Sequence, residues 1–316
     1  MKFSILVAAY NARQYLPQCL DSLFGQTEKS VQVIVIDDCS TDDSLPLQQS
    51  YTKVRDNCVL LLHTPHNSGQ AEARNLGLHY AAGELTLMVD ADDWLAPECL
   101  ERIWEAYTQA PDIDAVTMRL MLHDDDGSER EWNDPSLLPA VMTGAEACAY
   151  TLERRLHGLY AVRTSIHQEF PFDTTSRLYS DDNTTYIHYL HSRRVARSGG
   201  IYYYRQHDTS TTHQMGISRL MFLRANISLR QQLEAADCDD HTLTLCERHC
   251  WENYVGIYRQ MQRLCRTTSL TEEQEDEIRD TLHEAYEQLC LDRLGKHKCP
   301  YPLFRLKQRM IMWIKG

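Results

Sequence analysis

The sequence has little of what marks fibrous, membrane-spanning or nucleic-acid-binding chains. Glycine and proline supply only 13 and 10 of its 316 residues, too few for a collagen-like or low-complexity protein. It has no run of about 18 consecutive apolar residues, so we expect no membrane-spanning helix. Its 32 Lys and Arg are outnumbered by 45 Asp and Glu, and the formal charge of −13 argues against a nucleic-acid partner. With 43% hydrophobic residues, the chain can bury a large core.

Eleven cysteines are present, without regular spacing and without a secretory signal before them. We therefore expect reduced thiols in a cytoplasmic protein rather than a disulfide framework. Cys246, His249 and Cys250 fall on one face of a predicted helix and raise the alternative of a zinc site. Because no Cys-x-x-Cys pair accompanies them, buried thiols on an amphipathic helix are the favoured interpretation.

The first half of the chain alternates strand and helix patterns. Four apolar runs predict buried parallel strands, at 3–9, 31–36, 59–62 and 85–89. Apolar spacing predicts one helix near 16–24 and another over 69–82, with Gly83 as its C-terminal cap. A helix with Pro97 in its first turn, a strand over 114–122 and a hairpin turn at 124–127 follow. This alternation predicts an α/β fold with a mostly parallel sheet and right-handed crossovers.

The second half changes character near residue 216. Helical periodicity dominates 218–236, 243–266 and 271–294, with few strand signals. We therefore predict an α/β domain over 1–215 and a helical region over 216–316.

Polar residues directly follow three of the predicted strands: Tyr10-Asn11, Asp37-Asp38 and Asp90 to Asp93. In open α/β sheets, ligands bind outside the carboxyl ends of the strands. Aspartate after a strand also suits ordinary turns, which is the alternative interpretation. Three such ends in one predicted sheet favour a ligand site.

Closely spaced carboxylates are costly to bring together without a cation. Asp90, Asp92 and Asp93 therefore predict a hard divalent ion, Mg²⁺ or Mn²⁺, which is commonly held together with substrate phosphates. The sequence has neither a G-x-G-x-x-G loop nor a G-x-x-x-x-G-K-[ST] loop to cradle phosphates. This combination indicates a nucleotide diphosphate held by a metal ion.

Four ordered segments resemble a family 2 glycosyltransferase of the inverting type with the GT-A fold. The segments are Ile5 to Asn11, Val33 to Asp42, Asn67 to Gly77 and Ala82 to Asp93. One departure is Cys39, where the family usually has glycine.

The resemblance implies a role for each matching residue. Tyr10 would pack on the nucleotide base, Asp38 would accept a hydrogen bond from the base, and Asp92 would be the direct metal ligand. Asp90 would lie near the ribose and the metal, and Asp93 would add a further oxygen. The implied nucleotide-binding set is Ala9, Tyr10, Asn11, Asp37, Asp38, Arg74, Asp90 and Ala91. The alternatives are a core aromatic for Tyr10 and, for Arg74, a salt bridge to one of the aspartates.

The resemblance also implies a catalytic base in the second half. Inverting transfer needs a carboxylate that takes the acceptor proton, and Asp182 aligns with the family's proposed base. The alternative is helix capping by Ser180, Asp181 and Asp182. Arg205 and His207 would contact the diphosphate or order a loop.

The last residues form a basic tail. From Arg293 to Gly316 the sequence has seven Lys or Arg, no acidic residue and interleaved apolar side chains. Such a tail suits either peripheral contact with an anionic membrane or packing on the acidic body.

Together these observations predict an inverting, metal-dependent transferase. It would move a sugar from a nucleotide-diphosphate donor, a UDP-sugar, to a hydroxyl of a glycan or lipid-linked acceptor, in surface polysaccharide synthesis at the inner membrane face. The competing functions are a nucleotidyltransferase and a catalytically inactive, nucleotide-sugar-binding partner subunit. The first lacks its usual Gly- and Lys-containing loop here, and the retained aspartates argue against the second.

Overall fold

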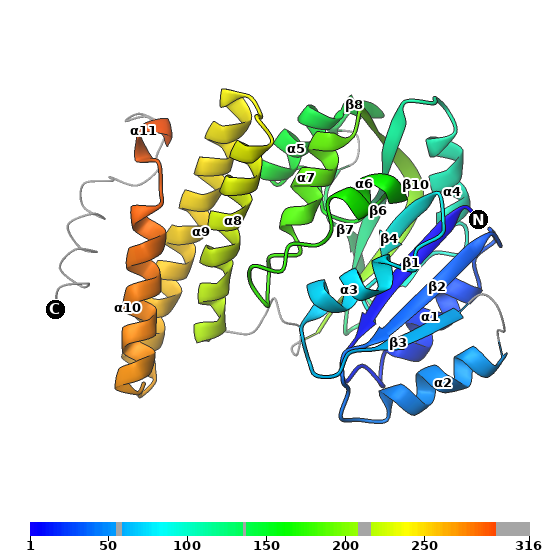
Figure 1. Ribbon diagram of the computed structural model, residues 1–316, viewed down its shortest axis with the longest axis horizontal. Helices are drawn as coiled ribbons and strands as arrows, with labels where there is room; N and C mark the ends of the chain where they lie inside the picture. Colours follow the sequence, from blue (N-terminus) through cyan, green and yellow to red (C-terminus); the bar gives the residue numbers. More distant parts are fainter. Residues whose placement is uncertain (55–58, 135–136, 208–215, 295–316) are drawn as a thin grey trace.

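The structure, a computed structural model, describes residues 1–54, 59–134, 137–207 and 216–294. Within them, a ten-stranded mixed sheet and its flanking helices form one part of the molecule (Figure 1). A group of long helices formed by the C-terminal region lies beside it, on the side away from β1. The predicted α/β fold with C-terminal helices is confirmed.

The first four strands make a parallel unit in the order β3-β2-β1-β4. They are β1 (Phe3–Ala9), β2 (Val31–Asp37), β3 (Val59–His63) and β4 (Leu85–Met88). The helices between them are α1 (Leu16–Phe24), α2 (Ser44–Val54) and α3 (Gln70–Leu78). All four strands match the apolar runs of the sequence. Strands β1, β2 and β4 are mostly buried and need continuous apolar residues, whereas the edge strand β3 is only half-buried.

Two predicted helix ends are wrong. Helix α3 ends at Leu78 and its C-cap is His79, so Gly83 does not cap it. A Cβ on Gly83 would lie 2.4 Å from the backbone of Ser4, so glycine is required there for close approach to β1. Pro97 precedes the Glu98 N-cap of α4 (Cys99–Tyr107) and is therefore outside its first turn.

A short antiparallel strand occupies the centre of the sheet. Strand β9 (Tyr160–Arg163) pairs antiparallel with both β4 and β6 (Ile113–Asp124). The long β10 (Arg194–Gln206) pairs parallel with β6, and β5 (Trp94–Leu95) completes the edge.

The remaining strands are short additions to this half. They are β7 (Glu129–Glu131), which pairs with β6, and β8 (Val141–Thr143), which pairs with β10. The predicted hairpin turn is confirmed, because Asp124 donates its N–H to the Ser128 carbonyl at 3.0 Å and Gly127 has a φ of 83°.

The helices of the second half cover one face and continue into the C-terminal group. They are α5 (Gly144–Leu152), α6 (Thr164–Glu169), α7 (Asn183–His191), the 3₁₀ turn η2 (Ile217–Leu220), α8 (Met221–Ala235), α9 (Asp240–Thr267), α10 (Glu272–Glu287) and α11 (Leu291–Leu294). Thr271 caps α10 in a capping box with Gln274, in agreement with the predicted helix start.

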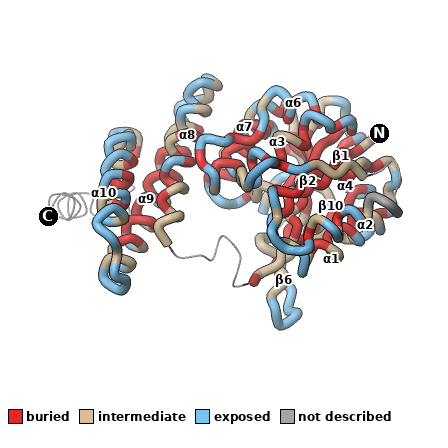
Figure 2. The backbone as a smooth tube through the Cα atoms, turned by 60° about the horizontal axis from the view of Figure 1, so that its bottom comes forward, coloured by how far each residue is buried: buried red, intermediate tan, exposed pale blue. Residues whose placement is uncertain are grey.

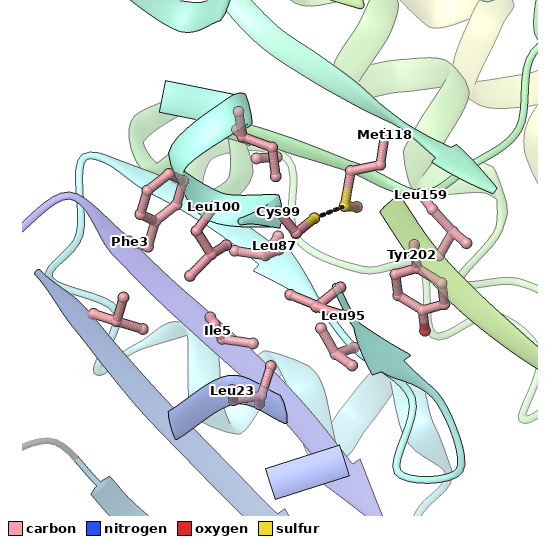
Figure 3. Packing of buried hydrophobic residues seen from close by; sticks show 14 of the residues in the cluster. Phe3, Ile5, Leu23, Leu87, Leu95, Cys99, Leu100, Met118, Leu159 and Tyr202 are labelled. Carbon is pink, nitrogen blue, oxygen red and sulfur yellow. Dashed lines mark hydrogen bonds between the residues drawn. The ribbon is translucent and has the colours of Figure 1, made fainter. Parts of the chain in front are cut away.

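The core lies in and beside the sheet (Figure 2). Around β1, residues such as Phe3, Ile5 and Leu87 pack with α4, and the Cys99 thiol lies 3.7 Å from the Met118 sulfur (Figure 3). A second cluster joins α5 and α7 to α8 and α9. The buried sulfurs of Cys246 and Cys250 belong to it, 4.0 Å apart. The core is therefore continuous across residue 216, and the boundary between 1–215 and 216–316 stays a prediction.

In the described ranges, no helix combines the length and apolar character needed to cross a bilayer. Most of the basic tail, residues 295–316, lies outside the described residues. At its start, Arg293 pairs with Asp240 at 2.9 Å.

Candidate active site

The carboxylates after β2 hold two loops in place. Asp38 is 3% exposed, and its carboxylate accepts hydrogen bonds from the Thr64 hydroxyl (2.7 Å) and from the N–H groups of Ser68 (2.9 Å) and Gly69 (2.8 Å). The Ser68 hydroxyl adds a fourth bond at 3.0 Å. Asp37 accepts from the Ser40 N–H at 3.1 Å. Both aspartates thus hold the loops that follow β2 and β3 in position at the end of the sheet.

The residues after β1 meet the same loops. The Asn11 amide oxygen accepts the Thr41 N–H at 2.8 Å, and the Ala9 carbonyl accepts the Asp38 N–H at 2.8 Å. Tyr10 is 47% exposed, so its alternative interpretation as a core aromatic is wrong. Cys39 has a φ of 60°, which explains why glycine suits this position.

A buried arginine links the strand ends to α7. Arg74, 2% exposed, donates from Nη1 to Asp181 at 2.8 Å and from Nη2 to Asp90. Gln70 donates to the same Asp181 oxygen at 2.6 Å. The predicted alternative for Arg74, an ion pair with an aspartate, is what the structure contains. Reduced hydration raises the pKa of Asp90 to about 6. The positive charge of Arg74 opposes this rise, and the negative charges of Asp92 and Asp181 add to it.

The end of β4 is tied to β10 through a buried tyrosine. The Tyr202 hydroxyl accepts the Asp90 N–H at 3.0 Å and donates to Asp93 at 2.7 Å. Asp93 is 1% exposed and also accepts the Arg205 N–H at 2.8 Å. Burial, with the charges of Asp90 and Asp92, holds the pKa of Asp93 well above its usual range. Both Asp93 oxygens are thus engaged by β10, and its part in metal binding stays a prediction.

Asp92 is, with Asp90, one of the two partly exposed carboxylates of this loop. Its side chain is 34% exposed, and one oxygen lies 2.9 Å from Nε2 of His207. Ala91 beside it is buried. Arg205 donates from Nε to the Asp92 carbonyl at 2.9 Å, and its guanidinium lies between the rings of Tyr15 and Trp94. Arg205 and His207 therefore hold the loop that carries Asp92.

Asp182 differs from every other aspartate of the site. It precedes α7, but its side chain makes no capping hydrogen bond, so the capping alternative does not describe it. The side chain is exposed, and no group in the described part of the chain hydrogen-bonds to its carboxylate. The protein atoms around it limit its hydration and, with the charge of Asp181, raise the pKa of Asp182 to about 7. A carboxylate with that pKa is suited to accept a proton near neutral pH.

Two partners of the site, Gln70 and Tyr202, did not stand out in the sequence. Asp181 and Gln70 hold Arg74, and Tyr202 joins Asp90 to Asp93. Asp181 stands directly before the predicted base and was expected only as an alternative capping residue.

Known proteins resemble this chain in sequence and in fold. Residues 4–230 match the model of glycosyl transferase family 2. A poly(ribitol-phosphate) beta-glucosyltransferase of Bacillus spizizenii is 35% identical over 122 residues, which are 38% of this chain and 19% of that protein. Glycosyltransferase GlyG of Streptococcus pneumoniae is 34% identical over 113 residues, which are 36% of this chain and 37% of that protein. The matched segments therefore span well under half of these relatives.

Solved structures extend the likeness to nearly the whole fold. The crystal structure of Staphylococcus aureus TarS 1–349 in complex with UDP-GlcNAc has a TM-score of 0.72 at 22% identity and covers 93% of this chain and 83% of that one. The mannosyltransferase of Pyrobaculum calidifontis in complex with GDP-Man and Mn²⁺ has a TM-score of 0.52 at 16% identity and covers 99% and 86%. These likenesses confirm the predicted GT-A fold. On the match of its sequence over residues 4–230, the chain belongs to glycosyl transferase family 2.

Proposed function

We propose that the chain is an inverting, metal-dependent glycosyltransferase that moves a sugar from a UDP-sugar to a hydroxyl of a glycan or lipid-linked acceptor. One observation carries the proposal: Asp182 is an exposed, unbonded carboxylate with a pKa of about 7, next to a buried network that joins Asp90 and Asp181 through Arg74. A partner subunit without catalysis has no need of such a base.

The donor would bind at the carboxyl ends of β1, β2 and β4. Tyr10 presents an exposed ring there for the base, and Ala9, Asn11 and Asp37 shape the wall beside it. Asp38 is already bonded to four donors, so we expect it to act mainly by holding the loop after β3. The choice of a uridine donor is supported by the likeness to TarS, a structure that contains UDP-GlcNAc.

Asp92 fits the metal that the family implies. It offers an accessible carboxylate oxygen, and Mg²⁺ or Mn²⁺ is often bound through one or two carboxylates together with substrate phosphates. Asp90 would complete the protein's share, although Arg74 already occupies one of its oxygens. Bound there, the ion would supply positive charge to the departing diphosphate.

In the proposed reaction, the acceptor hydroxyl gives its proton to the Asp182 carboxylate as its oxygen forms a bond to the anomeric carbon. The bond from that carbon to the diphosphate oxygen breaks on the opposite face, so the configuration inverts. Arg74 acts indirectly, because it compensates the charges of Asp181 and Asp90 and thereby allows both carboxylates to lie close to Asp182.

The test is Asp182→Asn, assayed as UDP release from a panel of UDP-sugars with glycan acceptors. We expect a loss of transfer of about 10²-fold or more, because general base catalysis contributes at least that much. Calorimetry should show unchanged binding of UDP with Mn²⁺. In the wild type, transfer should rise about tenfold per pH unit below pH 7 and level off above it, because only the deprotonated carboxylate accepts a proton.

The matched control is Asp125→Asn, an exposed aspartate in the hairpin turn after β6. It should leave both transfer and UDP binding unchanged. If Asp182→Asn lost transfer and UDP binding to the same extent, its assignment as base would be wrong. A wild-type protein that bound UDP but transferred no sugar would instead be the inactive partner subunit. Peripheral membrane contact and surface polysaccharide synthesis stay predictions.

A further inference from the structure

A second pocket lies away from the strand ends, where the end of α5 meets the first half of α9. Its volume is about 410 Å³, within the usual range of ligand sites. Its charged lining is Glu153, Arg154, Arg155, Arg248 and Glu252, a local excess of positive charge. Because the chain as a whole has a formal charge of −13, such a lining would attract anionic groups that the rest of the surface repels.

Arg154 occupies a backbone position that favours glycine. Its φ is 59°. The N–H groups of Arg154 and Arg155 donate to the carbonyls of Thr151 (2.9 Å) and Tyr150 (2.8 Å), the hydrogen bonds of a Schellman motif that ends α5. A left-handed conformation is unfavourable for any residue with a Cβ. The guanidinium, which donates to the Asn253 side chain at 2.7 Å, is thus held at the pocket despite backbone strain.

His249 adds a buried nitrogen that lacks a partner. The residue is 8% exposed and lines the pocket. Its ring hydrogen-bonds to the Leu152 carbonyl, whereas no group in the described residues bonds to its Nδ1. Burial, with the charge of Arg154, lowers the pKa of His249 to about 4, so the ring is neutral at pH 7. Because Nδ1 is itself buried, the ring forms a neutral part of the pocket wall and does not offer this nitrogen to a bound group.

The pocket adjoins the helix that begins after the proposed base. The ring of His249 lies 5.9 Å from that of Tyr186, one turn beyond Asp182 in α7. The chain after Arg155 also returns to the start of α7, since a Cβ on Gly158 would lie 2.8 Å from the Thr185 hydroxyl oxygen. A chain bound in the pocket would therefore be near the first turn of α7.

We propose that this pocket, the Arg154–Arg248 pocket, binds an anionic, hydroxyl-bearing segment of the acceptor glycan. The inference rests on the proposed function, and it names the class of acceptor. Arg154 and Arg248 would bind phosphate or carboxylate groups, while the two glutamates, of which Glu153 pairs with Arg155, would accept hydrogen bonds from hydroxyls. A polyol-phosphate chain and a uronic acid chain share this chemistry. The site is a pocket between α5 and α9, which can admit a chain, whereas a membrane would meet the protein over a broad surface.

The test measures binding without transfer, using three labelled oligomers: a ribitol-phosphate oligomer, a galacturonate oligomer and neutral maltohexaose. The variant is the double substitution Arg154→Gly and Arg248→Gln. Glycine suits the backbone at 154, so the variant should melt no lower than the wild type. We expect the Kd for at least one anionic oligomer to rise about tenfold or more, because each lost arginine removes a charge-assisted hydrogen bond. Maltohexaose should bind weakly to both proteins.

The matched control is Arg263→Gln, an exposed arginine further along α9, which should leave all Kd values unchanged. Tighter binding of the ribitol-phosphate oligomer would identify phosphate as the recognised group, and tighter binding of the galacturonate oligomer would identify carboxylate. Either result supports the proposal. Wild-type binding that is equally tight for maltohexaose, or a double variant within twofold of the wild type, would overturn it. Arginine-dependent capture by phosphatidylglycerol vesicles without oligomer binding would also overturn it, in favour of a membrane.

A parallel titration with UDP and Mn²⁺ separates the two proposals. If UDP binds but neither anionic oligomer does, the pocket inference fails and the proposed transferase stands. If the oligomers bind but no UDP-sugar is used, the proposed function fails instead.

Discussion

Two of the aspartate pairs of this protein, Asp37-Asp38 and Asp181-Asp182, look alike in sequence and differ in structure. At the end of β2, Asp37 and Asp38 are buried and bonded to the protein, Asp38 by four donors. Before α7, Asp181 is bonded to Arg74 and Gln70, but Asp182 has no hydrogen-bond partner among the described residues. In the folded protein, both carboxylates of the first pair and one carboxylate of the second are thus engaged in hydrogen bonds. Only the carboxylate that folding leaves free is available for proton transfer.

The largest effect on stability should come from Arg74→Gln. The change leaves Asp90 and the buried Asp181 without their shared cation, and we expect a loss of about 3–5 kcal/mol in the free energy of unfolding. Urea denaturation measures it. Arg102→Gln, which breaks an exposed ion pair with Glu105, is the control and should change little. Equal losses in the two variants would show that Arg74 is not what holds the carboxylates together.

A smaller loss is expected for Asp38→Asn. The amide group would place N–H donors against the N–H and hydroxyl donors that now bond to the carboxylate, at a cost of about 1–3 kcal/mol. Thermal melting should show a lower Tm, whereas Asp125→Asn on the hairpin should not. An unchanged Tm for Asp38→Asn would remove the contrast between the two pairs.

The smallest effect, and one of opposite sign, is expected for Asp182→Asn. Its raised pKa means that the folded state binds the proton more tightly than the unfolded state, so this group costs stability as the pH rises from about 4 to about 7. Because the side chain is exposed, the asparagine variant should gain only about 1 kcal/mol at pH 8. The gain should vanish at pH 4. A lower Tm than the wild type at pH 8 would indicate a structural role for the carboxylate.

The sequence predicted β1, β2 and β4 because strands buried in the sheet have continuous apolar runs, and the half-buried edge strand β3 has such a run as well. It mistook Gly83 for a helix cap, since close approach to β1 is a property of the fold and not of the local pattern. The central β9 has only four residues, too few for periodicity to reveal it.

In the candidate site, too, local sequence patterns predicted single residues, whereas contacts made by the fold were not predictable. Motifs of consecutive residues predicted Asp90, Asp92 and Asp182, and the structure places Asp90 and Asp181 on the same guanidinium. Arg74 and Asp181 are 107 positions apart in the sequence, and no spacing rule connects them. The pocket at Arg154 was also invisible, because the left-handed backbone of an arginine leaves no trace in composition.

The position of β9 also governs how the sheet is completed during synthesis. A nascent chain that has emerged as far as Asp124 already contains β1 to β4 and β6, yet it lacks the strand that separates β4 from β6. Until residues 160–163 leave the ribosome, the edge of β4 has no native partner on that side and presents unpaired backbone groups. The pairing of β4 with β9 at the centre of the sheet joins segments more than 70 residues apart, and such long-range pairing favours slow folding.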